Sequence, residues 1–222
     1  MEITNANLLR LAGLSALIAG VCYVLVGLVH PANDPASVGS ASWGTVHVLA
    51  CAMSFFGVLG LAGIYARQAA RAGWLGLVGY VLLSFWMVLI MGFSFVEAFV
   101  LPQIASATPA FVDGWMKVFN GGTGAISMGA LPALWTMAAP AYILGGLLFG
   151  IATFRARVLP RGAAVLLAAG TVLAPLAAVL SLSAQPKMAI PVGLGLAWLG
   201  FALMVERRAP AVQAEPAIPV TV

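Results

Sequence analysis

Glu97 is the one acidic residue that lies deep inside a hydrophobic run of this chain, and it is the first candidate for chemistry. A carboxyl group inside a membrane is energetically costly, so an intramembrane acid is a functional candidate by default. Burial disfavours the charged form of a carboxyl, which would leave Glu97 protonated and able to act as a general acid. Two structural alternatives stay open. Glu97 could reach water near the end of its run, or it could make a hydrogen bond that holds two helices together.

Both histidines of the chain are expected near the level of Glu97. His30 ends the first hydrophobic run, and His47 lies about one turn inside the second. His47 shares a helix face with Cys51 and Ser54, at spacings of four and three residues, and such a polar face turns away from lipid. We therefore expect His47 and Glu97 at nearly the same depth, with His47 tuning the acid.

Aromatic side chains are expected below these polar groups. Phe93 and Trp86 share the helix face of Glu97, and Tyr23 shares a face with His30. Aromatic rings stabilise positive charge by cation–π contact. The pattern predicts a pocket that opens toward the outside, with a polar mouth and aromatic walls.

Other chemistries have weaker support in the sequence. A zinc site needs three or four ligands. His30, His47 and Glu97 could supply them with Asp34, but no compact ligand motif is present. The chain also has no P-loop and no pair of acids for holding magnesium on a diphosphate. We therefore predict neither a metal nor another cofactor.

The two cysteines, Cys22 and Cys51, are expected at similar depth on neighbouring helices. A disulfide between them is conceivable. Buried cysteines more often serve as small packing residues, which is the interpretation we favour.

The amino-acid composition indicates which class of protein holds these candidate side chains. The chain has 222 residues, of which 63% are hydrophobic and 7% are charged, with a mean hydropathy of +1.08. A soluble domain is about half apolar and about a quarter charged, so a soluble fold is excluded. Long unbroken apolar runs argue against an outer-membrane barrel, in which polarity alternates. The sequence predicts an all-α, polytopic bundle in the cell membrane, with the lipid bilayer as its surroundings.

Six apolar runs are long enough to cross a membrane, which takes about 20 residues in a helix. The predicted spans are about 11–29, 43–65, 74–101, 124–154, 163–182 and 188–205. They form one domain over residues 1–208. Residues 209–222, rich in Ala, Pro and Val, are expected to be a disordered cytoplasmic tail.

Basic residues set the expected orientation. Two lysines, Lys117 and Lys187, fall in connections on one side, and the arginines fall in the alternate connections. These arginines are Arg10, Arg67, Arg71, Arg155, Arg157, Arg161, Arg207 and Arg208. The positive-inside rule then places both termini in the cytoplasm. The net charge of +4 is thereby explained by topology, and no nucleic-acid partner is predicted.

The external connection after the third span is expected to contain a short amphipathic helix. Thr108-Pro109 is a helix-start signal and Asn120-Gly121 is a stop. Asp113 and Lys117 lie four residues apart, where they can pair. The opposite face carries Phe111, Trp115, Val118 and Phe119. This helix is either an interfacial connector with aromatic anchors or a lid over an outer cavity.

Three functions remain open on the sequence alone. We favour an integral membrane enzyme for a lipophilic substrate, with Glu97 as general acid and His47 beside it. Proton-initiated cyclisation or isomerisation of a terpenoid would suit such a pocket. The alternatives are a non-catalytic scaffold or partner subunit, and a small proton-coupled transporter that uses Glu97. The candidate substrate contacts are Trp86, Phe93, His30, Tyr23 and Trp115.

Overall fold

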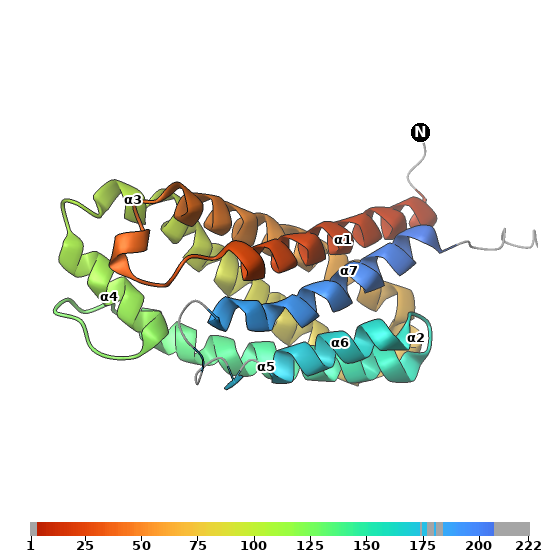
Figure 1. Ribbon diagram of the computed structural model, residues 1–222. Coiled ribbons are helices and arrows are strands. Elements are labelled where there is room, and N and C mark those ends of the chain that lie inside the picture. The colour runs from red at the N-terminus through yellow and green to blue at the C-terminus, as the bar shows by residue number, and fades with distance from the viewer. Residues whose placement is uncertain (1–3, 174, 177–179, 181–183, 207–222) are drawn as a thin grey trace, which may run out of the picture.

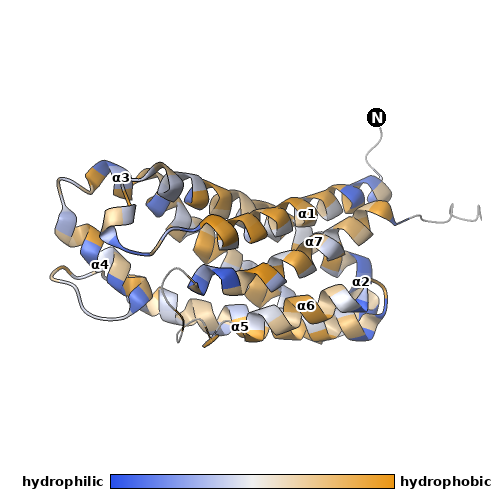
Figure 2. Ribbon diagram, in the orientation of Figure 1, coloured by the Kyte–Doolittle hydropathy of each residue, from blue (hydrophilic) through white to orange (hydrophobic). Residues whose placement is uncertain are grey.

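Every regular element in the described part of the chain is a helix. The computed structural model describes residues 4–173, 175–176, 180 and 184–206. Four helical stretches in it are long and apolar enough to cross a membrane: Asn5–Val29, Ala41–Ile104, Leu131–Ala156 and Gln185–Val205. Figure 2 shows their apolar character, with hydrophilic residues concentrated toward the ends. The prediction of an all-helical chain with helices long and apolar enough to cross a membrane is confirmed, while the predicted tail at 209–222 lies outside the described residues.

The elements follow one another along an elongated bundle (Figure 1). They are α1 (Asn5–Val29), the 3-10 turn η1 (Pro35–Ser37), α2 (Ala41–Phe99), α3 (Leu101–Ile104), α4 (Pro109–Asn120), α5 (Leu131–Ala156), α6 (Arg161–Val172), the 3-10 turn η3 (Gln185–Ala189) and α7 (Ile190–Val205). Thr4 caps α1 by accepting a hydrogen bond from the backbone N–H of Asn7.

The long helix α2 folds back on itself at Gly73. This residue has φ 56° and ψ −152°, a conformation that glycine adopts without the steric cost of a Cβ. The reversal divides α2 into a first arm, residues 41–72, and a second arm, residues 74–99. The rings of Tyr65 and Tyr80 stack across the two arms with their centroids 5.5 Å apart. The predicted runs 43–65 and 74–101 are therefore joined almost without a loop.

Several helix boundaries differ from the sequence prediction, and α1 begins at Asn5 instead of about residue 11. The run predicted over 124–154 becomes helical only at Leu131, because Gly129 has a positive φ of 58° and Pro132 then starts the helix. The helix predicted over 163–182 corresponds to α6, which ends at Val172; residues 174, 177–179 and 181–183 lie outside the described part. The helix predicted over 188–205 begins at Ile190, after the 3-10 turn.

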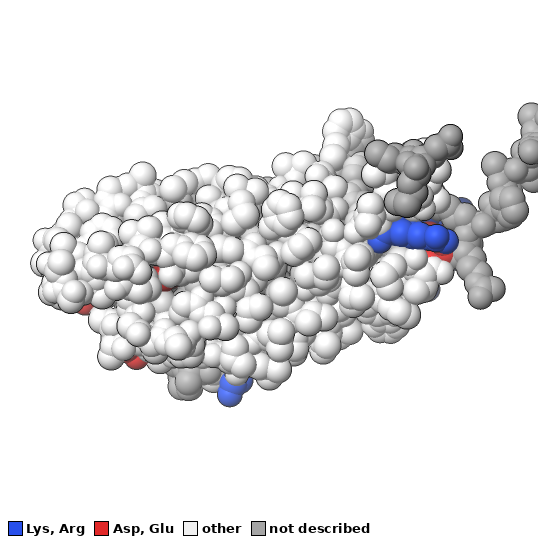
Figure 3. Space-filling model, turned by 90° about the horizontal axis from the view of Figure 1, so that it is seen from above, with Lys and Arg blue, Asp and Glu red and all other residues white. Residues whose placement is uncertain are grey.

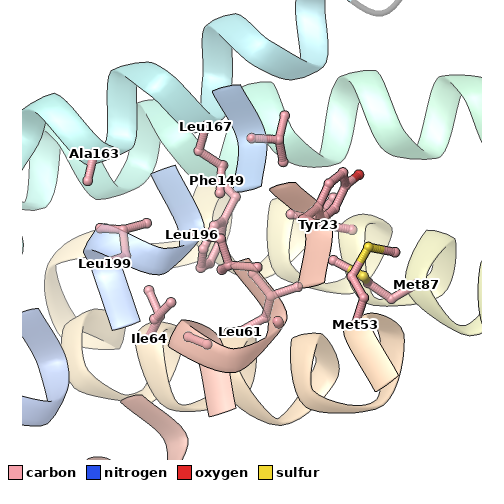
Figure 4. Close-up of a cluster of buried hydrophobic side chains, with 14 of the residues drawn as sticks. Tyr23, Met53, Leu61, Ile64, Met87, Phe149, Ala163, Leu167, Leu196 and Leu199 are labelled. Atoms are coloured by element: carbon pink, nitrogen blue, oxygen red, sulfur yellow. The ribbon is translucent and has the colours of Figure 1, made fainter. Parts of the chain in front are cut away.

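Small residues let the helices pack closely. A Cβ added at Gly60 on the first arm of α2 would lie 2.6 Å from the backbone of Ala16 on α1. One added at Gly195 on α7 would lie 2.7 Å from the backbone of Leu167 on α6. Such contacts are typical of membrane helices, which associate by packing rather than by the hydrophobic effect. Figure 4 shows the core that results, with Phe149, Leu196 and Leu61 converging from three helices.

Most charged side chains in the described part of the chain lie toward the two ends of the bundle, and Glu97 is the buried one among them. The end where α1 begins, α2 reverses and α5 stops carries Arg10, Arg67, Arg71, Arg155, Arg157 and Arg161. We call it the arginine end. The opposite end, covered by α3 and α4, is called the cap end. Figure 3 shows one face of the molecule, with blue and red atoms at the right end, red atoms toward the left, and one further blue group about midway along the lower edge.

Candidate functional site

Glu97 lies on the second arm of α2 at the cap end and is 6% exposed. Its Oε2 lies 3.2 Å from Nε2 of His47, on the first arm. Its Oε1 accepts a hydrogen bond of 3.2 Å from the indole N–H of Trp115, on α4. The backbone carbonyl of Glu97 accepts a 2.9 Å hydrogen bond from Trp43. The reversal at Gly73 thus brings together the two residues that the sequence placed at one depth.

The tautomer of His47 follows from the contact of its ring with the backbone. Nδ1 of His47 lies 2.8 Å from the carbonyl oxygen of Trp43. Because a carbonyl only accepts, Nδ1 must carry a hydrogen, and Nε2 of the neutral ring is then an acceptor. A hydrogen bond between Nε2 and Oε2 therefore needs one further proton, on either atom. Both arrangements leave the pair without net charge, which limits the cost of burial.

His30 follows the last residue of α1 and lies beside this pair. Its ring centroid is 5.1 Å from that of His47. Its Nδ1 lies 2.7 Å from the carbonyl oxygen of Pro31, so the same reasoning makes Nε2 an acceptor in the neutral ring. Burial is the main cause that lowers the pKa of His30, which favours the neutral ring near pH 7.

A cavity of about 290 Å³ adjoins these groups. Six residues singled out from the sequence line it: Tyr23, His30, His47, Trp86, Phe93 and Glu97. Trp115 does not line the cavity. It packs against Phe93, with ring centroids 5.7 Å apart, and holds the carboxyl of Glu97. Its role as a substrate contact stays a prediction, and the structure shows it bound to Glu97.

The deeper part of the cavity is formed by stacked aromatic rings. Tyr23 stacks on Trp86 with centroids 6.0 Å apart, and Trp86 lies 4.5 Å from Tyr142. Tyr23 and Tyr142 both line the cavity. Sequence reasoning missed Tyr142, although a phenol inside an otherwise apolar run was a usable signal.

Two more aromatic residues complete the wall near the cap end. Phe119 on α4 and Trp135 on α5 have ring centroids 4.6 Å apart, and each packs edge-on against Phe93. Both line the cavity. Trp135 could not be singled out from the sequence, because the direction in which it faces depends on where α5 begins. Phe119 was expected only on the apolar face of the amphipathic helix.

The amphipathic helix has the predicted bounds, since α4 runs from Pro109 to Asn120. Lys117 donates a 2.7 Å hydrogen bond to Asp113, as the four-residue spacing predicts. The buried side of α4 packs on the cap end of the bundle, in a cluster that includes Trp43, Phe93, Leu101, Val112 and Met116. Its place over Glu97 is therefore set by tertiary contacts.

We expect Trp115→Phe to destabilise the packing of α4 over Glu97 without leaving a large empty space. The variant keeps most of the ring packing but removes the N–H donor to Glu97, a loss of about 1–2 kcal/mol for a buried hydrogen bond. The midpoint of thermal unfolding in detergent should fall by roughly 2–8 °C. Trp74→Phe is the matched control, because Trp74 is 80% exposed. Equal midpoints for the two variants would contradict a supporting role for Trp115.

The described residues contain no group of three or more His, Cys, Asp or Glu side chains arranged to hold a metal ion. Of the groups considered for zinc, His30, His47 and Glu97 meet at the cavity, whereas Asp34 caps η1 through the backbone N–H of Ser37. Cys22 and Cys51 are both free thiols.

The chain was compared with protein-family models, with curated proteins and with solved structures, and none of the three comparisons finds a match.

Proposed function

We propose that this protein is an integral membrane enzyme that acts on a small lipophilic substrate by acid–base chemistry at the Glu97–His47 pair. The observation that carries the proposal is the buried contact between Glu97 and His47 at the wall of an aromatic cavity. Deep burial and convergent polar groups in an apolar pocket are typical of active sites. No cofactor is needed for such a reaction.

We further propose that the chain crosses the cell membrane six times, with both termini in the cytoplasm. The two arms of α2 would supply two crossings, and α1, α5, α6 and α7 one each. The concentration of arginines at one end supports this orientation through the positive-inside rule. The cavity would then open toward the outer leaflet, beneath α4.

The volume of the cavity limits the substrate. About 290 Å³ lies near the lower end of the range for small-molecule sites, which is about 300–1,000 Å³. A compact molecule fits such a space better than a two-chain phospholipid. The walls offer aromatic faces, which favour a substrate that develops positive charge. We therefore propose proton-initiated cyclisation or isomerisation of a terpenoid.

The Glu97–His47 pair gives up one proton in this reaction and regains one at its end. The proton that it gives up is transferred to one carbon of a substrate double bond, so that an O–H or N–H bond breaks and a C–H bond forms. The adjacent carbon becomes a carbocation, which the face of Trp86 or Phe93 stabilises. Attack by a second double bond closes a ring. Loss of a proton from a neighbouring carbon then forms a new double bond and restores the proton of the pair.

The alternatives of carrier and scaffold have less support. A proton-coupled carrier needs a polar path through the bundle, but Leu61, Ile64 and Phe149, each 0% exposed, fill the core beyond the cavity. A pure scaffold would need the Glu97–His47 contact but no cavity beside it. The cavity therefore favours the enzyme.

Filling the cavity tests whether it binds substrate. Ala50 lines the cavity and is 5% exposed, so Ala50→Phe would place a ring inside it. We expect the purified wild-type protein to bind farnesol, measured by quenching of tryptophan fluorescence, and Ala50→Phe to weaken binding at least about tenfold, which corresponds to about 1.4 kcal/mol. Ala66→Phe is the control, since Ala66 is exposed on the same arm. Farnesol binding that is equally strong in both variants would refute this use of the cavity.

A further inference from the structure

A second hollow of about 290 Å³ lies at the arginine end, away from the aromatic cavity. It is lined by Arg67, Gln68, Ala70 and Arg71 from the first arm of α2, and by Arg157 and Val158 after α5. Three arginines from distant parts of the sequence thus line one small space. The positive-inside rule accounts for arginines at this end, but not for their convergence on one hollow.

Two of these arginines have no counter-charge in the described part of the chain. Arg67 is bound by Glu206, with Nε 2.7 Å from a carboxyl oxygen. Arg71 and Arg157 make no ion pair with any described residue. Their positive charges repel each other, so an anion in the hollow would stabilise them.

The backbone of Arg157 points to a specific role for its side chain. It has φ 54° and ψ 31°, and is the sole non-glycine residue with positive φ among the described residues. Glycine usually occupies this position after a helix, because a Cβ is strained there. Strained residues of this kind concentrate at functional sites. Here the conformation places an arginine, instead of glycine, at the hollow.

Gln68 adds an unused acceptor to the same hollow. Its side chain is buried, with the residue 2% exposed, and Nε2 donates a 2.7 Å hydrogen bond to Thr153. Its Oε1 has no hydrogen-bond partner among the described residues. A buried acceptor without a donor is costly. A hydroxyl group of a ligand would satisfy it.

We propose that this hollow binds the phosphate headgroup of an anionic phospholipid. Guanidinium groups recognise phosphate oxygens through paired, charge-assisted hydrogen bonds. A glycerol headgroup carries hydroxyl donors for Oε1 of Gln68 beside its phosphate. Basic pockets at the ends of membrane helices are suited to such headgroups. The lipid would tie the reversal at Gly73 to the turn after α5.

Native mass spectrometry of the full chain in detergent tests this site, with phosphatidylglycerol and the zwitterionic phosphatidylcholine as probes. We expect the wild-type protein to retain phosphatidylglycerol preferentially, and the double variant R71Q/R157Q to lose that preference roughly tenfold or more. The matched double variant R10Q/R155Q removes the same amount of charge outside the hollow and should keep the preference for phosphatidylglycerol. Equal loss in both double variants, or loss in neither, would overturn the proposal.

Two further measurements distinguish loss of the site from misfolding, and the lipid from free phosphate as the ligand. Arg157→Gly removes the side chain at a φ that glycine prefers, so its unfolding midpoint without added lipid should not fall below that of the wild type. It should nevertheless lose phosphatidylglycerol, and retention of the lipid by this folded variant would contradict the assignment. Inorganic phosphate is then added as a competitor. If it displaces the lipid, phosphate alone is recognised; if it does not, the lipid is the ligand; both results support a phosphate site.

Discussion

Glu97→Gln is expected to leave the protein folded while lowering turnover of an acyclic terpenoid at least about 100-fold, the usual contribution of a general acid. The amide is nearly the same shape as the carboxyl. Its N–H can donate to Nε2 of His47, and its oxygen can still accept from Trp115. What the amide lacks is a proton that it can transfer. The variant therefore separates proton transfer from structure.

The measurement is product formation in D2O, followed by mass spectrometry. A proton-initiated reaction places one deuterium on carbon in the wild-type product, and Glu97→Gln should form almost none of it. Asp113→Asn is the control, because it removes a 44% exposed carboxylate at the same end of the molecule. Its turnover should match that of the wild type. Normal turnover in a folded Glu97→Gln protein would rule out the proposed acid.

Gly60→Leu is expected to disrupt the bundle more than any single change at the site. A Cβ at Gly60 would lie 2.6 Å from the backbone of Ala16, where no side-chain movement can relieve the overlap. Overpacking of this kind costs about 3 kcal/mol or more. The midpoint of thermal unfolding should therefore fall by at least about 6–12 °C, or the protein should fail to accumulate in the membrane.

Gly92→Leu provides the matched control on the second arm of the same helix. A Cβ at Gly92 would meet nothing within 4 Å, and the residue is exposed. Replacing glycine within a helix removes about 1 kcal/mol of unfavourable helix propensity. Gly92→Leu should therefore be at least as stable as the wild type. Similar midpoints for the two leucine variants would contradict the close approach of α1 and α2.

The two proposed sites lie at opposite ends of the bundle and are independent. The aromatic cavity lies near the cap end, and the arginine hollow lies where α2 reverses. Failure of Glu97→Gln to affect turnover would leave the lipid site untouched. Failure of Arg157→Gly to release lipid would leave the acid–base site untouched.

Local signals were sufficient for several features of this protein. The scarcity of charge predicted a membrane protein, because a water-facing surface needs far more ionisable groups. Thr108-Pro109 and Asn120-Gly121 predicted the bounds of α4, since capping and helix termination depend on neighbouring residues. Counting turns from the ends of two apolar runs placed His47 and Glu97 at one level, because helical rise is constant.

The boundaries of α5 could not be predicted with the same success. An apolar run marks where a helix can form, but residues 124–130 are also apolar or small and do not join it. Gly129 adopts a positive φ of 58° there, and helix α5 begins at Leu131. That choice depends on contacts of the preceding loop with α4, such as the approach of Gly124 to Gly114. Consequently the sequence could not predict the direction in which Trp135 and Tyr142 face from α5.

The sequence by itself determined the class of protein, the depth of its polar groups and the end at which its arginines lie. Tertiary structure decided which of these groups touch. The orientation of the His47 ring toward Glu97 depends on the carbonyl of Trp43 accepting from Nδ1, and the arginine hollow depends on an unusual φ at Arg157. Apolar patterns set the depth of a residue along a helix, whereas side-chain contacts also depend on helix rotation. That rotation is set by close packing at glycines such as Gly60, which no single helix specifies alone.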